Sequence, residues 1–226
     1  MSIDFTARFQ TVLDRIRAAE RQFQRPPGSV ELLAVSKTHP ASAVAALAAL
    51  GQHHFGENYL QEALDKIADL AALNLEWHFI GPIQANKTRS IAEHFAWVHS
   101  VDRLKIAERL NAQRPDDLPP LNVCLEVNID REPSKHGFDE RELADIAQAV
   151  AALPRLRLRG LMAIPAPAAD FAAQRLPFAR LRQWAERLNI EGLDTLSMGM
   201  SDDLEAAIAE GATLVRIGTA LFGPRA

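Results

Sequence analysis

Lys37 has the clearest capacity for covalent chemistry in this chain of 226 residues. It stands directly after an apolar run, residues 32–36, that is typical of a buried strand. At the end of such a strand an amine is partly desolvated, and desolvation or a neighbouring cation lowers its pKa. A neutral amine is what a lysine needs to form an imine with a carbonyl compound. Its position alone also fits an ordinary solvated lysine. A chemical role for Lys37 therefore has to be supported by suitable partner groups elsewhere in the chain.

Two later segments have the composition of anion-binding turns. They are Ser197-Met198-Gly199-Met200-Ser201-Asp202 and Arg216-Ile217-Gly218-Thr219, each where an apolar run gives way to a helical stretch. Glycine lets backbone N–H groups approach an anion closely. Ser201 is predicted to begin the next helix, where free N–H donors attract phosphate, although an ordinary helix cap explains it equally well. Each turn alone therefore indicates a phosphate site only weakly.

The elements that position these residues follow a repeated pattern. Residues 4–24 predict an amphipathic helix, which Pro26-Pro27-Gly28 ends. Short runs of successive apolar residues then alternate with Ala/Leu-rich stretches, which indicates parallel strands buried on both faces. The predicted strands are 31–36, 53–56, 77–80, 97–99, 122–129, 158–164, 195–198 and 214–217, and the predicted helices between them are 40–50, 58–72, 84–94, 102–112, 139–153, 170–189 and 202–210.

Length favours a closed barrel over an open sheet. Eight units of about 25 residues are close to the roughly 31 of a typical (β/α)8 barrel. A doubly wound sheet normally has fewer strands and a glycine-rich first turn, whereas the first turn here, residues 36–40, has no glycine. We therefore predict an α/β fold, a (β/α)8 TIM barrel with an extra N-terminal helix, and treat residues 1–226 as one domain.

A closed barrel brings the chemical groups together. Strand 8 then lies beside strand 1, so Arg216 becomes a neighbour of Lys37, and the carboxyl ends of the strands share one mouth. The turns at 197–202 and 216–219 lie after strands 7 and 8, where barrels often bind phosphate. This combination suits an aldehyde that also carries a phosphate group.

Composition narrows the partners and the location. The chain has 25 Lys+Arg against 29 Asp+Glu, a formal net charge of −4, so nothing indicates binding to nucleic acid or to an anionic membrane. The single Cys124 excludes a disulfide within the chain. The start has no secretory pattern and no apolar run is long enough to span a bilayer. We expect a cytoplasmic protein.

Five motifs in order along nearly the whole chain add a specific resemblance: Ala34-Val35-Ser36-Lys37-Thr38, Phe55-Gly56-Glu57-Asn58-Tyr59, Trp77-His78-Phe79-Ile80-Gly81-Pro82-Ile83-Gln84-Ala85-Asn86-Lys87, Ser197-Met198-Gly199-Met200-Ser201-Asp202-Asp203 and Val215-Arg216-Ile217-Gly218-Thr219-Ala220-Leu221-Phe222-Gly223. The chain resembles the pyridoxal phosphate homeostasis protein family, whose fold is that of the alanine racemase N-terminal barrel. The resemblance implies that pyridoxal 5'-phosphate (PLP) is held as a Schiff base on Lys37, and that the protein buffers this vitamin B6 cofactor or delivers it to PLP-dependent apo-enzymes.

The same resemblance assigns further contacts with the cofactor. Arg216 is expected to face the pyridine nitrogen and Met162 to lie against the ring, with Asn58 as an additional contact. Lys135, in Ser134-Lys135-His136-Gly137, is a candidate for a second, looser PLP site. The residues expected to hold the phosphate are Ser201, Gly218 and Thr219.

Catalytic turnover is not expected. Arginine stays protonated, so Arg216 keeps the pyridine nitrogen unprotonated and makes the ring a poorer electron sink. Alanine racemases also use an arginine but add a tyrosine from a second domain, and only ten residues follow Arg216, while the sole tyrosine is Tyr59. The alternatives are a fold-type III PLP-dependent amino acid racemase or lyase, and a class I aldolase in which Lys37 binds a sugar phosphate.

Two histidines at predicted strand ends, His78 and His99, are expected to be structural rather than catalytic. Their spacing with Glu57 matches no metal motif, so no metal is expected. We also expect a monomer.

Overall fold

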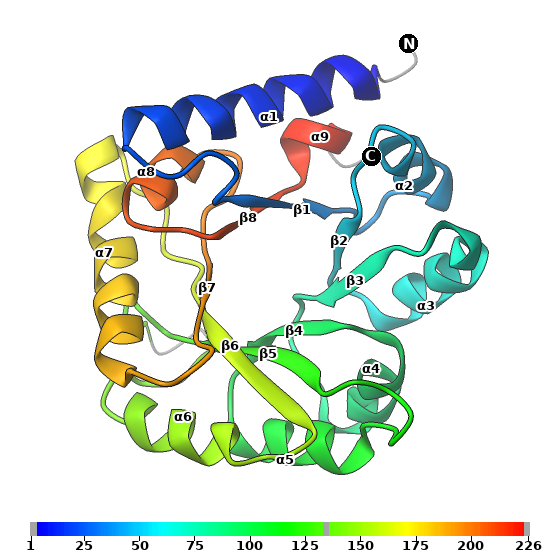
Figure 1. Ribbon diagram of the computed structural model, residues 1–226, viewed down its shortest axis with the longest axis vertical. Helices are drawn as coiled ribbons and strands as arrows, with labels where there is room; N and C mark the ends of the chain where they lie inside the picture. The colour runs from blue at the N-terminus through cyan, green and yellow to red at the C-terminus, as the bar shows by residue number, and fades with distance from the viewer. Residues whose placement is uncertain (1–3, 133–135, 224–226) are drawn as a thin grey trace.

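Eight parallel strands form a closed ring (Figure 1). The computed structural model describes residues 4–132 and 136–223. β8 pairs with β1, with Leu33 opposite Arg216, and this pairing closes the barrel. The predicted (β/α)8 barrel is confirmed. The strands are β1 (Glu31–Val35), β2 (His54–Glu57), β3 (Glu76–Phe79), β4 (Trp97–Val101), β5 (Leu121–Glu126), β6 (Leu156–Met162), β7 (Thr195–Ser197) and β8 (Leu214–Ile217).

Helices surround the barrel. Each connection between strands contains at least one of them, and a short helix follows β8. The helices are α1 (Phe5–Gln22), α2 (Ala41–Ala48), α3 (Leu60–Asp69), α4 (Thr88–His94), α5 (Leu104–Gln113), α6 (Leu143–Ala151), α7 (Phe171–Leu188), α8 (Leu204–Ala209) and α9 (Thr219–Phe222), with 3-10 turns η1 (Ala71–Leu73) and η2 (Ala85–Lys87).

The extra helix α1 lies across the outside of the barrel over the seam between β8 and β1 (Figure 1), where it contacts α2, α8 and α9. Asp4 caps it by accepting a hydrogen bond from the backbone N–H of Ala7. Arg15 donates to the carboxylate of Glu205 and to the backbone oxygen of Ser201 at 3.0 Å. α1 therefore braces the turn that follows β7.

The barrel has an outer core and an inner one. Side chains alternate along each strand, and Leu32 and Ala34 pack outward in the large core shared with the helices. Inside the ring a separate small apolar cluster is accompanied by buried polar side chains, which is unusual because barrel interiors are dominated by branched apolar residues. The small cluster consists of Trp97, Cys124 and Met162, and the buried polar residues with it include His78, His99, Ser197 and Arg216.

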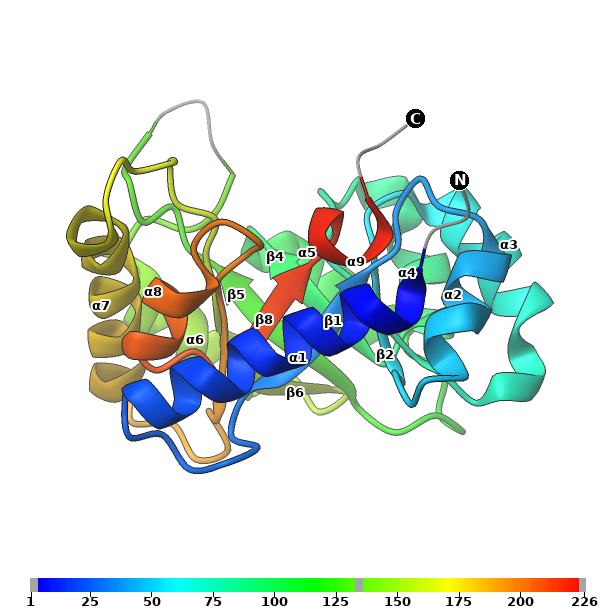
Figure 2. The same cartoon turned by 90° about the horizontal axis from the view of Figure 1, so that it is seen from above.

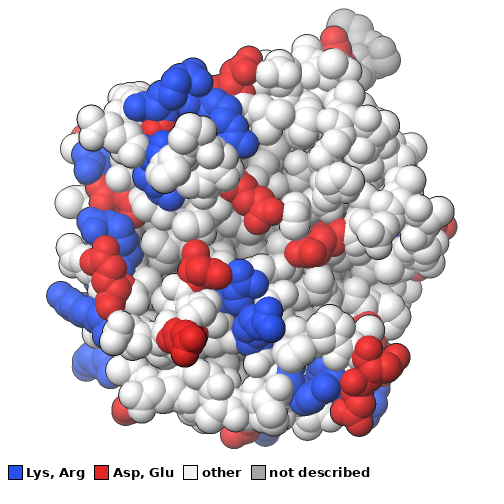
Figure 3. All heavy atoms as spheres, viewed as in Figure 1, with Lys and Arg blue, Asp and Glu red and all other residues white. Residues whose placement is uncertain are grey.

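The two ends of the barrel differ in what they carry. Figure 2 shows α9 after β8 at the upper end, whereas the loop that precedes β1 lies at the lower end. The lower end, which faces the viewer in Figures 1 and 3, carries Lys and Arg side chains interspersed with Asp and Glu rather than one basic patch. Within the described residues, no helix is both long enough and apolar enough to cross a membrane.

Several predicted boundaries were wrong by two to four residues, and two of them have identifiable reasons. β5 ends at Glu126 rather than Ile129, because the chain turns there and Phe138 donates its N–H to the backbone oxygen of Glu126 at 2.7 Å. The helix expected from residue 202 begins at Leu204, because the side chain of Asp203 accepts the N–H of Met200 at 2.6 Å and holds a turn. Ser201 therefore lies in that turn and does not begin the helix.

Candidate functional site

Lys37 lies two residues after the end of β1, at the upper end of the barrel, and is partly buried. The backbone before it is held in the sheet, since the N–H of Ser36 donates to the backbone oxygen of Gly56 at 3.0 Å. The backbone after it turns sharply, because Thr38 has φ of +65°, in the left-handed region that non-glycine residues rarely adopt. Lys37 therefore begins a constrained turn rather than a loose loop.

A buried ion pair holds the backbone just before this turn. Lys66 of α3 is 4% exposed and donates from Nζ to the backbone oxygen of Ser36 at 2.8 Å and to Oε1 of Glu57 at 2.7 Å. The hydroxyl of Ser36 donates to the same carboxylate oxygen at 2.6 Å. Burial raises the pKa of Glu57, while Lys66 and Ser36 act to lower it. Both residues are thus tied to the end of β1.

The backbone that follows Lys37 is also held by a residue of α3. The backbone N–H of Thr38 donates to Oε1 of Glu62 at 2.6 Å, and Glu62 also pairs with Lys66. Sequence reasoning did not identify Lys66 or Glu62. The available signal was a lysine that shares the buried stripe of α3 with Ala63, since a charged residue on an apolar face needs a partner.

Arg216 lies inside the barrel on β8, and its pairing partner is Leu33, the middle residue of β1. It donates to the backbone oxygen and, at 2.9 Å, to the hydroxyl of Ser197, and to the backbone oxygen of Ala163 at 2.9 Å. A guanidinium has five N–H donors, so these bonds to described residues leave two for a ligand. Burial lowers the pKa of Arg216 to about 10 despite nearby carboxylates, which still leaves it cationic at neutral pH.

The two glycine turns meet beside Arg216. Its backbone N–H donates to the backbone oxygen of Gly199 at 2.9 Å, which connects the turn after β7 to β8. Gly199 has φ of +94°, and a Cβ there would lie 2.6 Å from that of Ala207. A Cβ on Gly218 would lie 3.3 Å from the backbone oxygen of Val35, two residues before Lys37. The first turn therefore requires glycine, and the second lies close against the end of β1.

The remaining predicted residues fall around the same end of the barrel. Ser201 is partly buried in the turn after β7, and Thr219 is exposed as the first residue of α9. Met162 ends β6, pairs with Ser197 and is 1% exposed. Asn58 follows β2, and its buried Oδ1 has no hydrogen-bond partner among the described residues. Lys135 lies outside the described residues.

His78 and His99 lie within β3 and β4 inside the ring, not at strand ends as expected. Nδ1 of His99 is 2.7 Å from the hydroxyl of Ser197, and Nε2 is 2.9 Å from Nδ1 of His78. Burial, together with the charge of Arg216, lowers the pKa of His99 to about 3, so its ring is neutral. These histidines therefore form a hydrogen-bonded chain beneath Arg216.

The residues at this end fit a phosphorylated aldehyde that carries further polar groups. Lys37 offers an amine, Arg216 offers two N–H donors, and the buried Oδ1 of Asn58 needs a donor, which a hydroxyl group would supply. The turn at Gly199 is too tight for a side chain and that at Gly218 leaves little room for one, and both allow backbone N–H groups to approach an anion. A phosphorylated aldehyde such as PLP therefore matches the chemistry of this donor set.

Comparisons with known proteins define the class. The alanine racemase N-terminal domain family matches residues 10–226. The alanine racemase of Corynebacterium glutamicum superposes with a TM-score of 0.68 at 20% identity, over 94% of this chain and 60% of that one. This likeness shows the fold alone. The chain is thus a barrel of the alanine racemase N-terminal class.

Closer relatives define the family. The pyridoxal phosphate homeostasis protein of Pseudomonas aeruginosa is 67% identical over 214 residues, 95% of this chain and 93% of its own length. The protein of the same name from Escherichia coli K12 is 54% identical over 98% of this chain and 97% of its own. PipY of Synechococcus elongatus, solved with PLP bound, has a TM-score of 0.80 and 42% identity over 92% of this chain and 98% of its own. The chain belongs to the pyridoxal phosphate homeostasis protein family.

Proposed function

We propose that this protein binds PLP as a Schiff base on Lys37, and that it buffers the cofactor and delivers it to PLP-dependent apo-enzymes with little or no turnover. The observation that supports the proposal is the pairing of β1, which leads to Lys37, with β8, which carries Arg216, together with the glycine turns that adjoin these strands. The PLP-bound structure of PipY supports the choice of ligand, because that protein shares this fold over nearly its whole length.

Each group of residues has a distinct task in this proposal. Lys37 would hold the cofactor through its aldehyde, with loss of water, and the turn held by Lys66 and Glu62 would fix the position of its backbone. Arg216 donates a hydrogen bond to the pyridine nitrogen, while Met162 packs against the ring and Asn58 accepts from a hydroxyl group. The phosphate is held by Ser201, Gly218 and Thr219.

The proposed lack of turnover rests on Arg216 together with the missing second acid/base, since alanine racemases pair their arginine with a tyrosine and the sole tyrosine here is Tyr59. Bound PLP supplies an electrophilic aldehyde and a ring that accepts electron density. Enzymes that exploit the ring usually place a carboxylate at its nitrogen, which keeps the nitrogen protonated. The guanidinium of Arg216 is cationic and has only donors, so it favours the unprotonated nitrogen. Lys37 then holds the cofactor without promoting carbanion chemistry.

Absorption spectroscopy tests the attachment. The purified protein should show an imine band, and borohydride reduction followed by peptide mapping should place the label on Lys37. The variant Lys37→Ala should lose the band, while Lys105→Ala, which changes an exposed lysine of α5, should keep it. An unchanged imine band in Lys37→Ala would overturn the assignment.

Delivery needs a separate test. The loaded protein is mixed with a PLP-dependent apo-enzyme in the presence of a phosphatase that destroys free PLP. Buffering and delivery predict that the apo-enzyme becomes active under conditions in which the same amount of free PLP fails. If loaded protein activates no better than free PLP, the delivery part of the proposal is wrong while Schiff-base binding stands.

The shared fold with alanine racemase favours one alternative, a racemase or lyase of fold type III. Incubation of the loaded protein with single amino acids in deuterated buffer separates the two functions. Buffering predicts no exchange of the Cα hydrogen above the rate with free PLP. Rapid exchange or product formation with any amino acid would instead establish an enzyme.

A further inference from the structure

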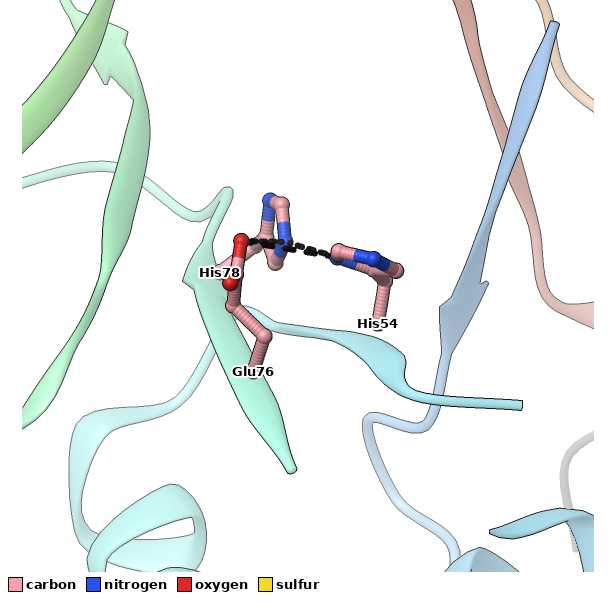
Figure 4. Close-up of side chains that lie close together, drawn as sticks. All are labelled: His54, Glu76 and His78. Atoms are coloured by element: carbon pink, nitrogen blue, oxygen red, sulfur yellow. Dashed lines mark hydrogen bonds and ion pairs between the residues drawn. The ribbon is translucent and has the colours of Figure 1, made fainter. Parts of the chain in front are cut away.

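Three side chains of types that can bind a metal ion lie close together at the lower end of the barrel, opposite Lys37. Figure 4 shows His54 on β2 pointing toward Glu76 and His78 on β3. Glu76 and His78 are two residues apart on one strand and therefore face the same side, and His54 is the pairing partner of Glu76. The alternation of one strand and the register of its neighbour thus bring three potential ligands to one point inside the ring.

We propose that this point binds one divalent transition-metal ion of the zinc class, with Nδ1 of His54, Nε2 of His78 and Oε1 of Glu76 as ligands. The two nitrogens are 3.1 Å apart, and Oε1 is 3.5 Å from Nδ1 of His54 and 3.6 Å from Nε2 of His78. Tetrahedral zinc with bonds of 2.0–2.2 Å separates its ligands by roughly 3.4 Å. The triangle therefore has the size that zinc requires without rearrangement of the backbone.

The outer contacts support the same atoms as ligands. A histidine that binds a metal usually donates its other ring N–H to a carboxylate or another acceptor. Nε2 of His54 lies 2.7 Å from Oε1 of Glu31, and Nδ1 of His78 lies 2.9 Å from Nε2 of His99. Both contacts use the nitrogen that faces away from the triangle. Once His54 has lost its proton to a metal, the ring nitrogens left to bind are Nδ1 of His54 and Nε2 of His78, the two that face each other in the triangle.

The third ligand is also oriented by a neighbour. The indole N–H of Trp97 donates to Oε1 of Glu76 at 2.7 Å, which leaves another lone pair of this oxygen for a metal. The ring of Trp97 also stacks on His78, with 7° between the planes. Two of the three ligands are therefore held in place before a metal arrives.

Solvent can reach this point. A hollow of about 770 Å³ opens at the lower end of the barrel, and Glu31, His54 and Trp97 line part of it. The side chain of His54 is 28% exposed and that of Glu76 is 41% exposed, whereas His78 is buried. An ion can enter from the hollow, and its fourth position would face water. The sequence-based expectation of no metal paired the histidines with Glu57, which instead contacts Lys66.

The competing state is a proton in place of the metal. Burial lowers the pKa of His54, but the carboxylates of Glu31 and Glu76 raise it to about 9. In metal-free protein His54 is then an imidazolium that donates to these neighbours. A divalent ion has to displace this proton, so the experiment must separate true ligation from a histidine that is merely charged.

Calorimetry and cobalt substitution separate the two states in tag-free protein. Titration with ZnCl2 should show one ion per chain, and CoCl2 should produce the intense visible bands of tetrahedral cobalt with nitrogen ligands. Glu31→Gln should weaken zinc binding by about 10- to 100-fold, the usual effect of losing an outer partner. His54→Ala and Glu76→Ala should weaken it further and abolish the cobalt bands.

Controls keep the test decisive. His94→Ala removes a histidine from the outer helix α4 and should bind zinc as the unchanged protein does. Circular dichroism and the imine band of Lys37, at the opposite end of the barrel, show whether each variant is folded. Absence of a stoichiometric zinc site in the unchanged protein would overturn the proposal. Equal binding in His54→Ala or Glu76→Ala would do the same, and the cluster would then be an imidazolium held by carboxylates.

Discussion

The Nζ atom of Lys66 lies 2.8 Å from the backbone oxygen of Ser36, the residue immediately before Lys37. One buried cation of α3 thus holds the segment after β1, and its counter-ion Glu57 is the last residue of β2. Buried ion pairs add little net stability, but removal of one partner leaves an uncompensated charge. We predict that this pair instead fixes the backbone turn that carries Lys37.

Substitution of Lys66 tests this role. Lys66→Met should lower the free energy of unfolding by about 3–5 kcal/mol, because the carboxylate of Glu57 stays buried without its partner. Denaturant unfolding measures the loss. The double variant Lys66→Met/Glu57→Gln should recover much of the stability but still form the imine more slowly than the unchanged protein. A stable double variant with an unchanged rate of imine formation would show that the pair does not position Lys37.

Stability at low pH should depend on Glu20, which is 1% exposed near the end of α1. Burial raises the pKa of this carboxyl group, but hydrogen bonds from Arg17, Gly28 and Val30 outweigh burial and lower it below 4.5. The unfolded chain therefore binds the proton more readily, so the stabilisation is present above about pH 4.5 and is lost as the pH falls through the folded value.

Unfolding of Glu20→Gln at several pH values checks this prediction. At pH 7 the variant should be less stable by about 2–3 kcal/mol, since hydrogen bonds to a buried charge are lost. The difference between the two proteins should shrink as the pH is lowered below 4.5. A difference that stays constant from pH 7 to pH 3 would show that the charge of Glu20 is not responsible.

Cys124 should be inert in the folded protein. It is fully buried inside the barrel, and burial raises its pKa to about 12. At pH 8 the reactive thiolate is then roughly one part in 10⁴ of the thiol. Iodoacetamide should therefore leave native protein unmodified for hours and alkylate it fully in guanidinium chloride. Rapid labelling under native conditions would show that the interior opens to solvent.

Gly199→Ala tests the turn after β7. Alanine is strained at φ of +94°, and its Cβ would lie 2.6 Å from that of Ala207. We expect a loss of about 1–3 kcal/mol in stability and weaker PLP binding, measured by titration of the imine band. Gly192→Ala is the matched control, because Gly192 has φ of +82° with no atom within 4 Å of the added Cβ. Equal PLP affinity in both variants would show that this turn does not contribute to phosphate binding.

Much of the fold could be predicted because local patterns suffice for it. Parallel strands covered on both faces have successive buried residues, and even the short strands at Phe55 and Val98 are buried along nearly their whole length. Closure of the ring then placed Arg216 beside β1. Boundaries that depend on a side chain, such as that of Asp203 capturing the N–H of Met200, could not be predicted, because the pattern does not show which hydrogen bond wins.

The sequence by itself therefore determined the barrel, the order of its strands, and the residue types at their carboxyl ends, since periodicity and chain connectivity are local properties. Only the tertiary structure decided which polar groups meet inside the ring. Lys66 reached Ser36, and His54 reached His78, because strand register and helix packing bring together residues that no spacing along the chain relates. A buried charge or imidazole ring needs a hydrogen-bond partner nearby in space, and the packing of strands and helices determines which residue that partner is.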